Sequence, residues 1–340
     1  MYRSALSAMQ RHALAVPVIA RLAALSVLPH PAQDTKRSRA VASILASTLA
    51  LLLAFAVLGA GSLAAETGYV TVSDGTRLYY EAEGQGKPIL LMHGWSGSNR
   101  FFDKNFAALA QQFRVYRIDI RGHGDSDKPE NGYTMLRYAK DLHDFLKAEN
   151  LDDVTVVGWS MGASILWGYY QLFGDDRISK MVFVDQAPAQ YMAPDWHYPQ
   201  PGCYDQAALE RLHARLLYDE KGAAMALVEG CRPEGVETSA ADMDFLVGEV
   251  MKTPARVKYW AMRDHTNHDW RRQLARIDLP VVMAIGRKSK MFDWRGTKQG
   301  CDILPRCTAV YFEESGHMPF WEEPRKFNRM LTELVNGDPD

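Results

Sequence analysis

The sequence predicts an α/β protein with one mostly parallel, eight-stranded sheet, helices on both faces and a helical cap inserted after the sixth strand. Short, continuous apolar runs such as Pro88–Met92 and Val154–Val157 are typical of strands that are buried on both faces. Helical stretches alternate with these runs, which implies parallel strands joined by crossover helices. Between Pro188 and Ile277 the pattern is helical and contains no run suited to a buried strand.

The eight expected strands begin with a hairpin. Tyr69–Val72 and Leu78–Ala82 alternate as half-buried strands do, and Asp74-Gly75 supplies the turn between them. The other six strands are expected at 88–92, 115–118, 154–157, 181–184, 281–285 and 310–312. Core helices are expected near 102–112, 134–149, 161–173 and 321–335, and cap helices at 209–217, 223–228, 241–251 and 256–262.

Composition and charge limit the class of protein. The chain has 340 residues, of which 47% are hydrophobic and 24% charged, and this balance excludes a disordered, collagen-like or small disulfide-rich protein. Residues 1–65 are basic, so the remainder of a chain with net charge −2 is mildly acidic and has no footprint for nucleic acid. We expect an N-terminal segment at 1–65, a core at 66–187 and 279–340, and a cap at 188–278.

The N-terminal segment has the order of a targeting signal. Lys36, Arg37 and Arg39 precede a stretch without charge at residues 40–65, and Ser62-Leu-Ala64 suits cleavage by a signal peptidase. The same stretch is long enough to remain as a membrane anchor, so membrane attachment through residues 40–65 is the alternative. An organelle transit peptide is a third interpretation of this segment. The first two place the body outside the cytoplasm, either exported (periplasmic or secreted) or anchored.

The four cysteines all lie in the body, which fits an oxidising compartment. We expect the bridges Cys203–Cys231 and Cys301–Cys307, because each pair lies in one local region; other pairings and four free thiols remain as alternatives. No Cys-x-x-Cys pair indicates zinc, and no metal is expected. His265 and His268 are flanked by acids, but we expect them on a solvated cap helix rather than at a metal site.

Gly158-Trp-Ser-Met-Gly162 is the strongest chemical signal. It follows the strand at 154–157 and opens a helical stretch, as expected of a nucleophile elbow in which a sharp turn exposes Ser160. The flanking Gly158 and Gly162 must be small because they crowd together in such a turn. The helix N-terminus behind Ser160 also favours negative charge.

Two further loops fit the same chemistry. His93-Gly-Trp95 follows the strand at 88–92, so the backbone N–H groups of Trp95 and Met161 are the expected oxyanion hole; the His93 side chain is expected to brace the loop. His317 follows the last strand and precedes the final helix, which is the place for a base that activates Ser160.

From about residue 68 to 335 the chain resembles the α/β-hydrolase superfamily, in its capped branch of esterases, lactonases and cofactor-free haloperoxidase-like enzymes. The resemblance rests on His93-Gly-Trp95, Asp119-Ile-Arg-Gly-His-Gly124, the Ser160 motif and Gly316-His317. It implies a Ser–His–acid triad in that chain order and no metal or organic cofactor.

The acid is the one departure from this pattern. Many relatives place it as Gly-x-x-Asp after the strand equivalent to 281–285, but this chain has Gly286-Arg-Lys-Ser289 there. Asp185 ends the preceding strand, where some relatives carry the acid, and Asp293 lies further along the later loop. We expect Asp185 and keep Asp293 as the alternative.

The expected reaction is hydrolysis of a small-molecule carboxylic ester or lactone through an acyl-enzyme formed on Ser160. Hydrolysis of a carbon–carbon bond or an amide and haloperoxidase-type peracid formation use the same triad and remain alternatives. A non-catalytic ligand-binding protein is an alternative from another class. Aromatic residues of the cap favour an apolar or aromatic group in the substrate; these are Trp196, Tyr198, Trp260 and Trp270.

Overall fold

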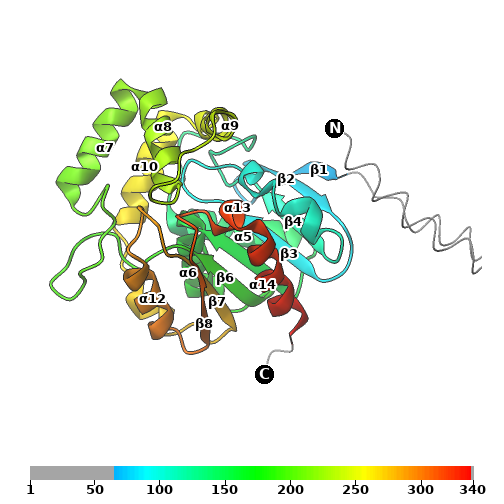
Figure 1. Cartoon of the computed structure of the whole chain (residues 1–340). Helices are drawn as coiled ribbons and strands as arrows, with labels where there is room; N and C mark the ends of the chain where they lie inside the picture. Colours follow the sequence, from blue (N-terminus) through cyan, green and yellow to red (C-terminus); the bar gives the residue numbers. More distant parts are fainter. Residues whose placement is uncertain (1–64, 338–340) are drawn as a thin grey trace, which may run out of the picture. The chain divides into compact units, whose positions relative to one another are not determined.

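Eight strands form one sheet in the order β1-β2-β4-β3-β5-β6-β7-β8 in the computed structural model, which describes residues 65–337 (Figure 1). The first two pairings, β1 with β2 and β2 with β4, are antiparallel, and all others are parallel. The predicted fold class is confirmed. The strands are β1 (Glu66–Thr71), β2 (Arg77–Glu83), β3 (Pro88–Met92), β4 (Arg114–Ile118), β5 (Val154–Trp159), β6 (Ile178–Val184), β7 (Val281–Gly286) and β8 (Cys307–Phe312).

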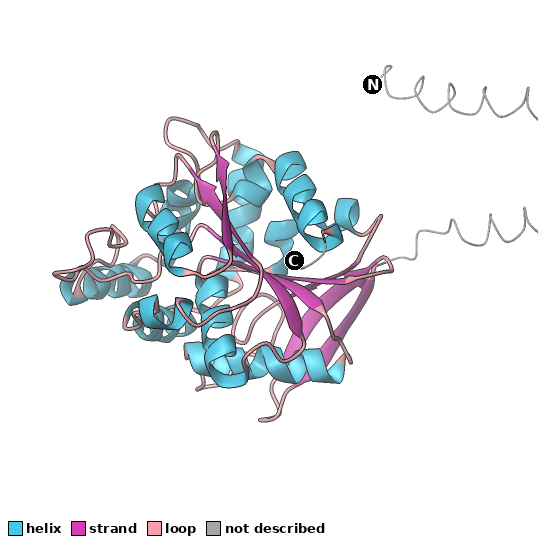
Figure 2. Cartoon of the chain, turned by 90° about the horizontal axis from the view of Figure 1, so that it is seen from below, coloured by secondary structure: helices cyan, strands magenta, loops and turns pink. Residues whose placement is uncertain are grey.

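Helices cover both faces of the twisted sheet (Figure 2). An apolar cluster lies on each face of the sheet. One cluster includes side chains of α5, α6 and α12, and the other includes side chains of η1, α4, α13 and α14. These elements are η1 (Asn99–Phe102), α4 (Phe106–Leu109), α5 (Met135–Ala148), α6 (Met161–Phe173), α12 (Trp294–Ile303), α13 (Pro319–Glu322) and α14 (Pro324–Asn336). The helix expected at 102–112 is therefore two short pieces, and α12 was not predicted.

The central strands explain why their sequences read as unbroken apolar runs. In β3, Leu90 packs in the cluster on the α5 and α6 side, whereas Leu91 packs in the opposite cluster. In β5, Val156 and Val157 divide between the two clusters in the same way. Because successive side chains of a strand point to opposite faces, both faces need apolar residues when both are covered by helices.

The segment between β6 and β7 is helical, as predicted. It contains α7 (Gln206–Tyr218), α8 (Glu220–Cys231), α9 (Ala240–Met251), α10 (Ala255–Thr266) and the short α11 (Arg271–Leu274). Figure 1 shows α7 to α10 gathered together beyond one end of the sheet. Three of these helices begin at side-chain caps: Asp205 accepts the N–H of Ala208, Asp219 that of Gly222 and Ser239 that of Asp242.

One of the two expected disulfides is present. Cys301 in α12 is bonded to Cys307 in β8, whereas Cys203 and Cys231 are free thiols, so the predicted Cys203–Cys231 bridge is wrong. The Cys203 thiol lies 3.1 Å from the side-chain oxygens of both Gln190 and Gln200. Cys231 instead ends α8, where its carbonyl accepts the N–H of His317. Cys203 and Cys231 therefore take part in different contacts, although both lie in the segment between β6 and β7.

The predictions for the N-terminal segment concern residues 1–64, which lie outside the described part of the chain. Among the helices of residues 65–337, none combines the length and the apolar character that crossing a bilayer requires.

Candidate active site

The turn between β5 and α6 holds Ser160 in an unusual backbone conformation. Its φ is 54° and its ψ is −123°, a region that non-glycine residues rarely adopt and that costs of order 1–3 kcal/mol. A Cβ on Gly158 would lie 2.6 Å from the backbone of Gly162, so the turn requires glycine there. The local structure therefore has the strain and the crowding expected of a nucleophile elbow.

The loop after β3 lies directly beside Ser160. A Cβ on Gly94 would be 2.9 Å from the Ser160 Cβ, so this loop can approach only because position 94 is glycine. The Trp95 indole N–H donates to the carbonyl of Lys258 in α10 at 2.9 Å. Met161 is the first residue of α6, where backbone N–H groups lack partners inside the helix.

His93 holds the loop after β3 in place through hydrogen bonds that involve both of its ring nitrogens. Its Nδ1 lies 2.8 Å from the carbonyl of Gly94, and its Nε2 accepts the N–H of Ile120 at 3.2 Å, so Nδ1 carries the proton. The ring is fully buried, and burial lowers the pKa of His93 to about 4. A neutral imidazole with both nitrogens engaged has a structural part in the site.

The structure brings His317 and Asp185 together. His317 Nδ1 is 2.7 Å from Asp185 Oδ2, and the two side chains are 5% and 0% exposed. The same carboxylate oxygen accepts the hydroxyl of Ser289 at 2.6 Å, and Oδ1 accepts the N–H of Gly286 at 3.2 Å. Ser289, which lies in the loop after β7, therefore contacts the aspartate that directly follows β6.

Asp293 is engaged elsewhere. It is the N-cap of α12, accepts the N–H of Arg295 at 2.9 Å and forms an ion pair with the Arg295 side chain. The pattern of an aspartate before a helix could have indicated this role. Of the two candidate acids, Asp185 therefore contacts His317, whereas Asp293 pairs with Arg295.

The loop that carries His317 is held by contacts that the sequence did not indicate. The His317 N–H donates to the carbonyl of Cys231 at 2.8 Å, and the His317 carbonyl accepts the indole N–H of Trp159. Glu322 accepts the N–H of Gly316 at 2.7 Å and lies 3.4 Å from Arg232. Because Cys231 and Arg232 belong to the helical insertion, one wall of the insertion fixes this loop.

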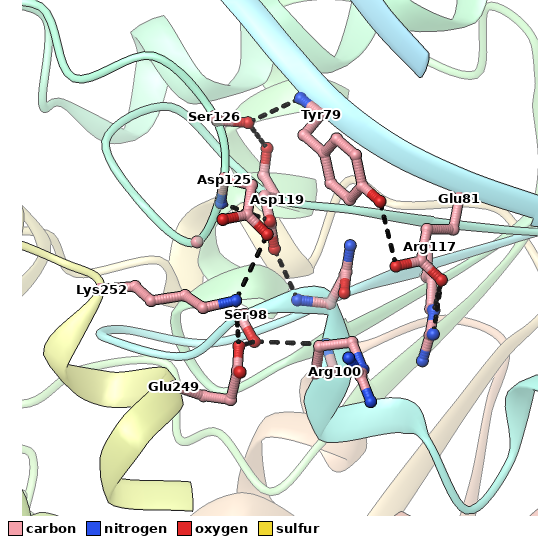
Figure 3. A network of polar contacts seen from close by, with 12 residues as sticks. Tyr79, Glu81, Ser98, Arg100, Arg117, Asp119, Asp125, Ser126, Glu249 and Lys252 are labelled. Atoms are coloured by element: carbon pink, nitrogen blue, oxygen red, sulfur yellow. Dashed lines mark hydrogen bonds and ion pairs between the residues drawn. The ribbon is translucent and has the colours of Figure 1, made fainter. Parts of the chain in front are cut away.

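A second set of contacts joins α9 to the loops after β3 and β4 (Figure 3). Ser98 donates to Glu249 at 2.7 Å, and the Lys252 ammonium lies 3.1 Å from Glu249 and 3.3 Å from Asp125. The buried Asp119 accepts the N–H of Asp125 at 2.7 Å. This network holds the end of α9 against the loop that runs beside Ser160.

Ser160 and His317 both line one cavity of about 290 Å³. Its walls are mostly apolar and come from the core loops and from α7, α8, α9 and α10. The aromatic side chains in the lining are Trp95, Phe101, Trp159 and Phe292. The four cap aromatics that we took to favour an apolar or aromatic substrate group are not among the lining residues: Trp196 and Trp270 are buried in packing clusters, Tyr198 packs beside Trp196, and Trp260 is half exposed.

The expectation that His265 is solvated is wrong, since its side chain is buried in α10 and lines the cavity. His268 stacks on Trp270 at 4.6 Å between ring centroids. Within residues 65–337, no three His, Cys, Asp or Glu side chains lie close enough together to hold a metal ion.

Comparison with known proteins agrees with this fold. The model of the alpha/beta hydrolase fold family matches residues 87–324. A non-heme chloroperoxidase from Streptomyces lividans is 27% identical over 79% of this chain and all of its own length. Among solved structures, an esterase from Exiguobacterium antarcticum has a TM-score of 0.76 at 23% identity, covering 80% of this chain and 100% of the esterase. An esterase from a Rhodococcus species has a TM-score of 0.69 at 25% identity, with coverages of 81% and 99%.

Proposed function

Because the chain belongs to the alpha/beta hydrolase fold family, we propose that it is a serine hydrolase of carboxylic esters or lactones, with Ser160, His317 and Asp185 as its triad. The observation that supports this most is that His317, whose Nδ1 lies 2.7 Å from Asp185, lines the same cavity as Ser160. Esterases among the similar structures support the choice of substrate class.

The proposed reaction has two half-reactions. Ser160 Oγ attacks the ester carbonyl while His317 Nε2 takes its proton, and Asp185 stabilises the imidazolium through Nδ1–H. The N–H groups of Trp95 and Met161 bind the oxyanion, each worth roughly 2.7–4 kcal/mol in the transition state. His317 protonates the leaving alcohol and then takes a proton from the water that attacks the acyl-serine. As the bond between the acyl carbon and Ser160 Oγ breaks, His317 returns this proton to Oγ, which releases the acid and restores Ser160.

We assign the insertion at 188–278 to a cap that excludes bulk water from this reaction. Residues of α7, α8, α9 and α10 supply much of the cavity wall, which supports the assignment. An apolar, enclosed wall strengthens the electrostatic interactions of the oxyanion and the imidazolium.

Covalent labelling tests the nucleophile. A fluorophosphonate probe should label the protein at Ser160, and Ser160→Ala should abolish both labelling and hydrolysis of a short-chain aryl ester. Ser164→Ala is a matched control, because Ser164 is a buried serine one turn further along α6 whose hydroxyl has no hydrogen-bond partner in the structure. Labelling that survives in Ser160→Ala would contradict the proposal.

Peracid formation is a second candidate activity, which the similarity to the Streptomyces lividans chloroperoxidase favours. In that reaction hydrogen peroxide replaces water as the attacker of the acyl-serine, and the product is a peroxy acid. Adding hydrogen peroxide to the ester assay distinguishes the two. A peracid yield that depends on Ser160 supports this activity, whereas carboxylic acid as the sole product favours plain hydrolysis.

The location of the protein is a further proposal. The Cys301–Cys307 bridge fits an oxidising compartment, and the N-terminal sequence has the order of an export signal. Cell fractionation together with N-terminal sequencing of the mature protein tests this. A reduced protein that keeps residue 1 and remains in the cytoplasm would contradict it.

A further inference from the structure

The cap side of the cavity carries polar atoms that the protein leaves without partners. Gln190 and His265 are each 3% exposed and both line the cavity, yet Gln190 Nε2 and His265 Nδ1 have no hydrogen-bond partner in the structure. A buried polar atom without a partner costs roughly 1–3 kcal/mol. Gln190 Nε2 is a donor, and His265 Nδ1 is a donor in the tautomer that carries its proton there, so a ligand that supplies oxygen acceptors would satisfy both atoms.

These residues belong to one wall. The Gln190 side-chain oxygen lies 3.1 Å from the Cys203 thiol, and Cys203 packs in the same apolar cluster as Met262 of α10. Lys258, Met262 and His265 are spaced four and three residues apart on α10, so they share one helix face. All five residues line the cavity.

Lys258 gives this wall a positive charge. Its side chain is 1% exposed, and its ammonium forms an ion pair with Glu220 at 2.9 Å. An ammonium has three N–H donors, so this pair leaves donors for a second acceptor. Arg215 and Lys290 also line the cavity, whereas no Asp or Glu is among its lining residues within 65–337.

Trp95 connects this wall to the elbow. Its backbone follows Gly94, which lies against Ser160, and its indole N–H reaches the carbonyl of Lys258. Trp95 therefore links the loop beside Ser160 to α10 of this wall, and Ser160 lines the same cavity as Lys258, Gln190 and His265. A substrate with its ester at Ser160 and an apolar chain along the cavity can place an acceptor group at this wall.

We propose that Lys258, Gln190 and His265 form a carboxylate subsite, and that the substrates are esters whose acyl part ends in a free carboxylate, that is, monoesters of dicarboxylic acids. This proposal rests on the proposed serine hydrolase function and names its substrate class. The carboxylate oxygens accept from the Lys258 ammonium and from Gln190 Nε2. The methylene chain lies against the apolar wall.

Matched substrates test the subsite. The assay compares kcat/KM for mono-4-nitrophenyl esters of adipic and suberic acid with that for the same compounds capped as methyl esters at the far end. In the natural protein the free acids should be preferred at least about tenfold, since a hydrogen bond to a charged group is worth that much or more. Lys258→Met should lower this preference by about tenfold, and Gln190→Met should lower it in the same direction.

Arg263→Met is the matched control, because Arg263 is an exposed cation of the same helix that does not line the cavity. It should leave the preference as it is in the natural protein. Glu220 is 32% exposed and can be hydrated when Lys258 is replaced, and thermal unfolding checks that each variant is folded. No preference for the free acids, or a preference that survives Lys258→Met, would overturn the subsite.

A binding measurement separates this proposal from the proposed function. Adipate is titrated into Ser160→Ala while the tryptophan fluorescence is followed, because Trp95 and Trp159 line the cavity. Saturable binding that Lys258→Met weakens supports the subsite even where no ester is hydrolysed. Ester hydrolysis without adipate binding or free-acid preference supports the hydrolase and refutes the subsite.

Discussion

Replacing Asp185 by asparagine removes one charge from the contact on which the proposed triad depends. The carboxylate has three neighbours that donate to it: His317 Nδ1–H at 2.7 Å, the Ser289 hydroxyl at 2.6 Å and the Gly286 N–H at 3.2 Å. An asparagine side chain offers one acceptor oxygen and one NH₂ group. It cannot satisfy all three donors in either orientation.

Each orientation has a definite cost. If the amide oxygen faces His317, the NH₂ group opposes the N–H of Gly286. If the NH₂ group faces His317, Nδ1 must lose its proton and Nε2 must carry it, so the imidazole can no longer take the proton of Ser160. The negative charge that stabilises the imidazolium is lost in both. We expect kcat to fall about 10⁴-fold, which corresponds to ~5.5 kcal/mol in the activation free energy.

Hydrolysis of a short-chain aryl ester measures this loss, and thermal unfolding shows whether the variant is folded. Asp293→Asn is the matched control, because asparagine caps a helix as well as aspartate does and Asp293 has no contact with His317. It should keep kcat within about twofold. The reasoning would be refuted by an Asp185→Asn variant with more than a tenth of the natural activity, or by an equal loss in Asp293→Asn.

Three further predictions concern stability. Reduction of the Cys301–Cys307 disulfide should lower the free energy of unfolding by about 2 kcal/mol, as expected for so short a loop. Urea unfolding with and without reductant measures this loss, and a variant with both Cys301 and Cys307 replaced by serine should not respond to reductant. Gly158→Ala should destabilise the protein by about 1–3 kcal/mol and reduce activity at least tenfold, because the added Cβ would lie 2.6 Å from backbone atoms. Gly248→Ala in α9 is the control: its Cβ would meet no atom within 4 Å, so this variant should be neutral or slightly stabilising. Equal effects of the two substitutions on the urea midpoint would contradict the crowding argument. Burial raises the pKa of Glu322 to about 8, so the native state retains a proton that the unfolded state loses near its ordinary pKa, and stability falls as the pH rises from about 5 to 8. Glu322→Gln should show a smaller fall between urea midpoints at pH 5 and pH 8, and parallel curves for the two proteins would count against a buried, protonated Glu322.

The core of the fold was predictable because its signals are local. The expected strand at 88–92 and helix at 161–173 coincide with β3 and α6, since both faces of the strand are buried and the elbow fixes where the helix begins. The elbow, the loop after β3 and the position of His317 follow from short motifs at strand ends. Parallel strands bring those ends to one edge of the sheet, which is why motifs far apart in sequence meet.

One helical prediction was wrong and one helix was missed, each for an identifiable reason. The apolar spacing at 102–112 is helical, but Asn105 donates its side-chain amide to the carbonyl of Phe320 and to Asn328 in α14, and the chain forms η1 and α4 around it. The helix α12 contains two glycines and many charged or polar residues, so its propensity is low. At 102–112 the contacts of Asn105 with distant segments outweigh the local pattern, and α12 packs on the core cluster through Cys301.

The polar wall of the cavity could not be predicted from the sequence. Gln190 precedes the cap helices, whereas Lys258 and His265 lie on α10, and no motif links these positions. The Cys203 thiol that lies beside Gln190 was expected in a disulfide. Only packing shows that these side chains share one cavity and that some of their polar atoms lack partners.

The contacts that Cys231 and Arg232, at the end of α8, make with the His317 loop have a consequence for protein engineering. Exchanging caps between related hydrolases is a natural way to change what they accept, but here the transplanted piece would also have to reproduce the Cys231 carbonyl and Arg232. A graft chosen for its pocket shape alone would leave the imidazole poorly aligned. The junction after α8 therefore belongs with the catalytic framework, and recombination should cut on either side of it.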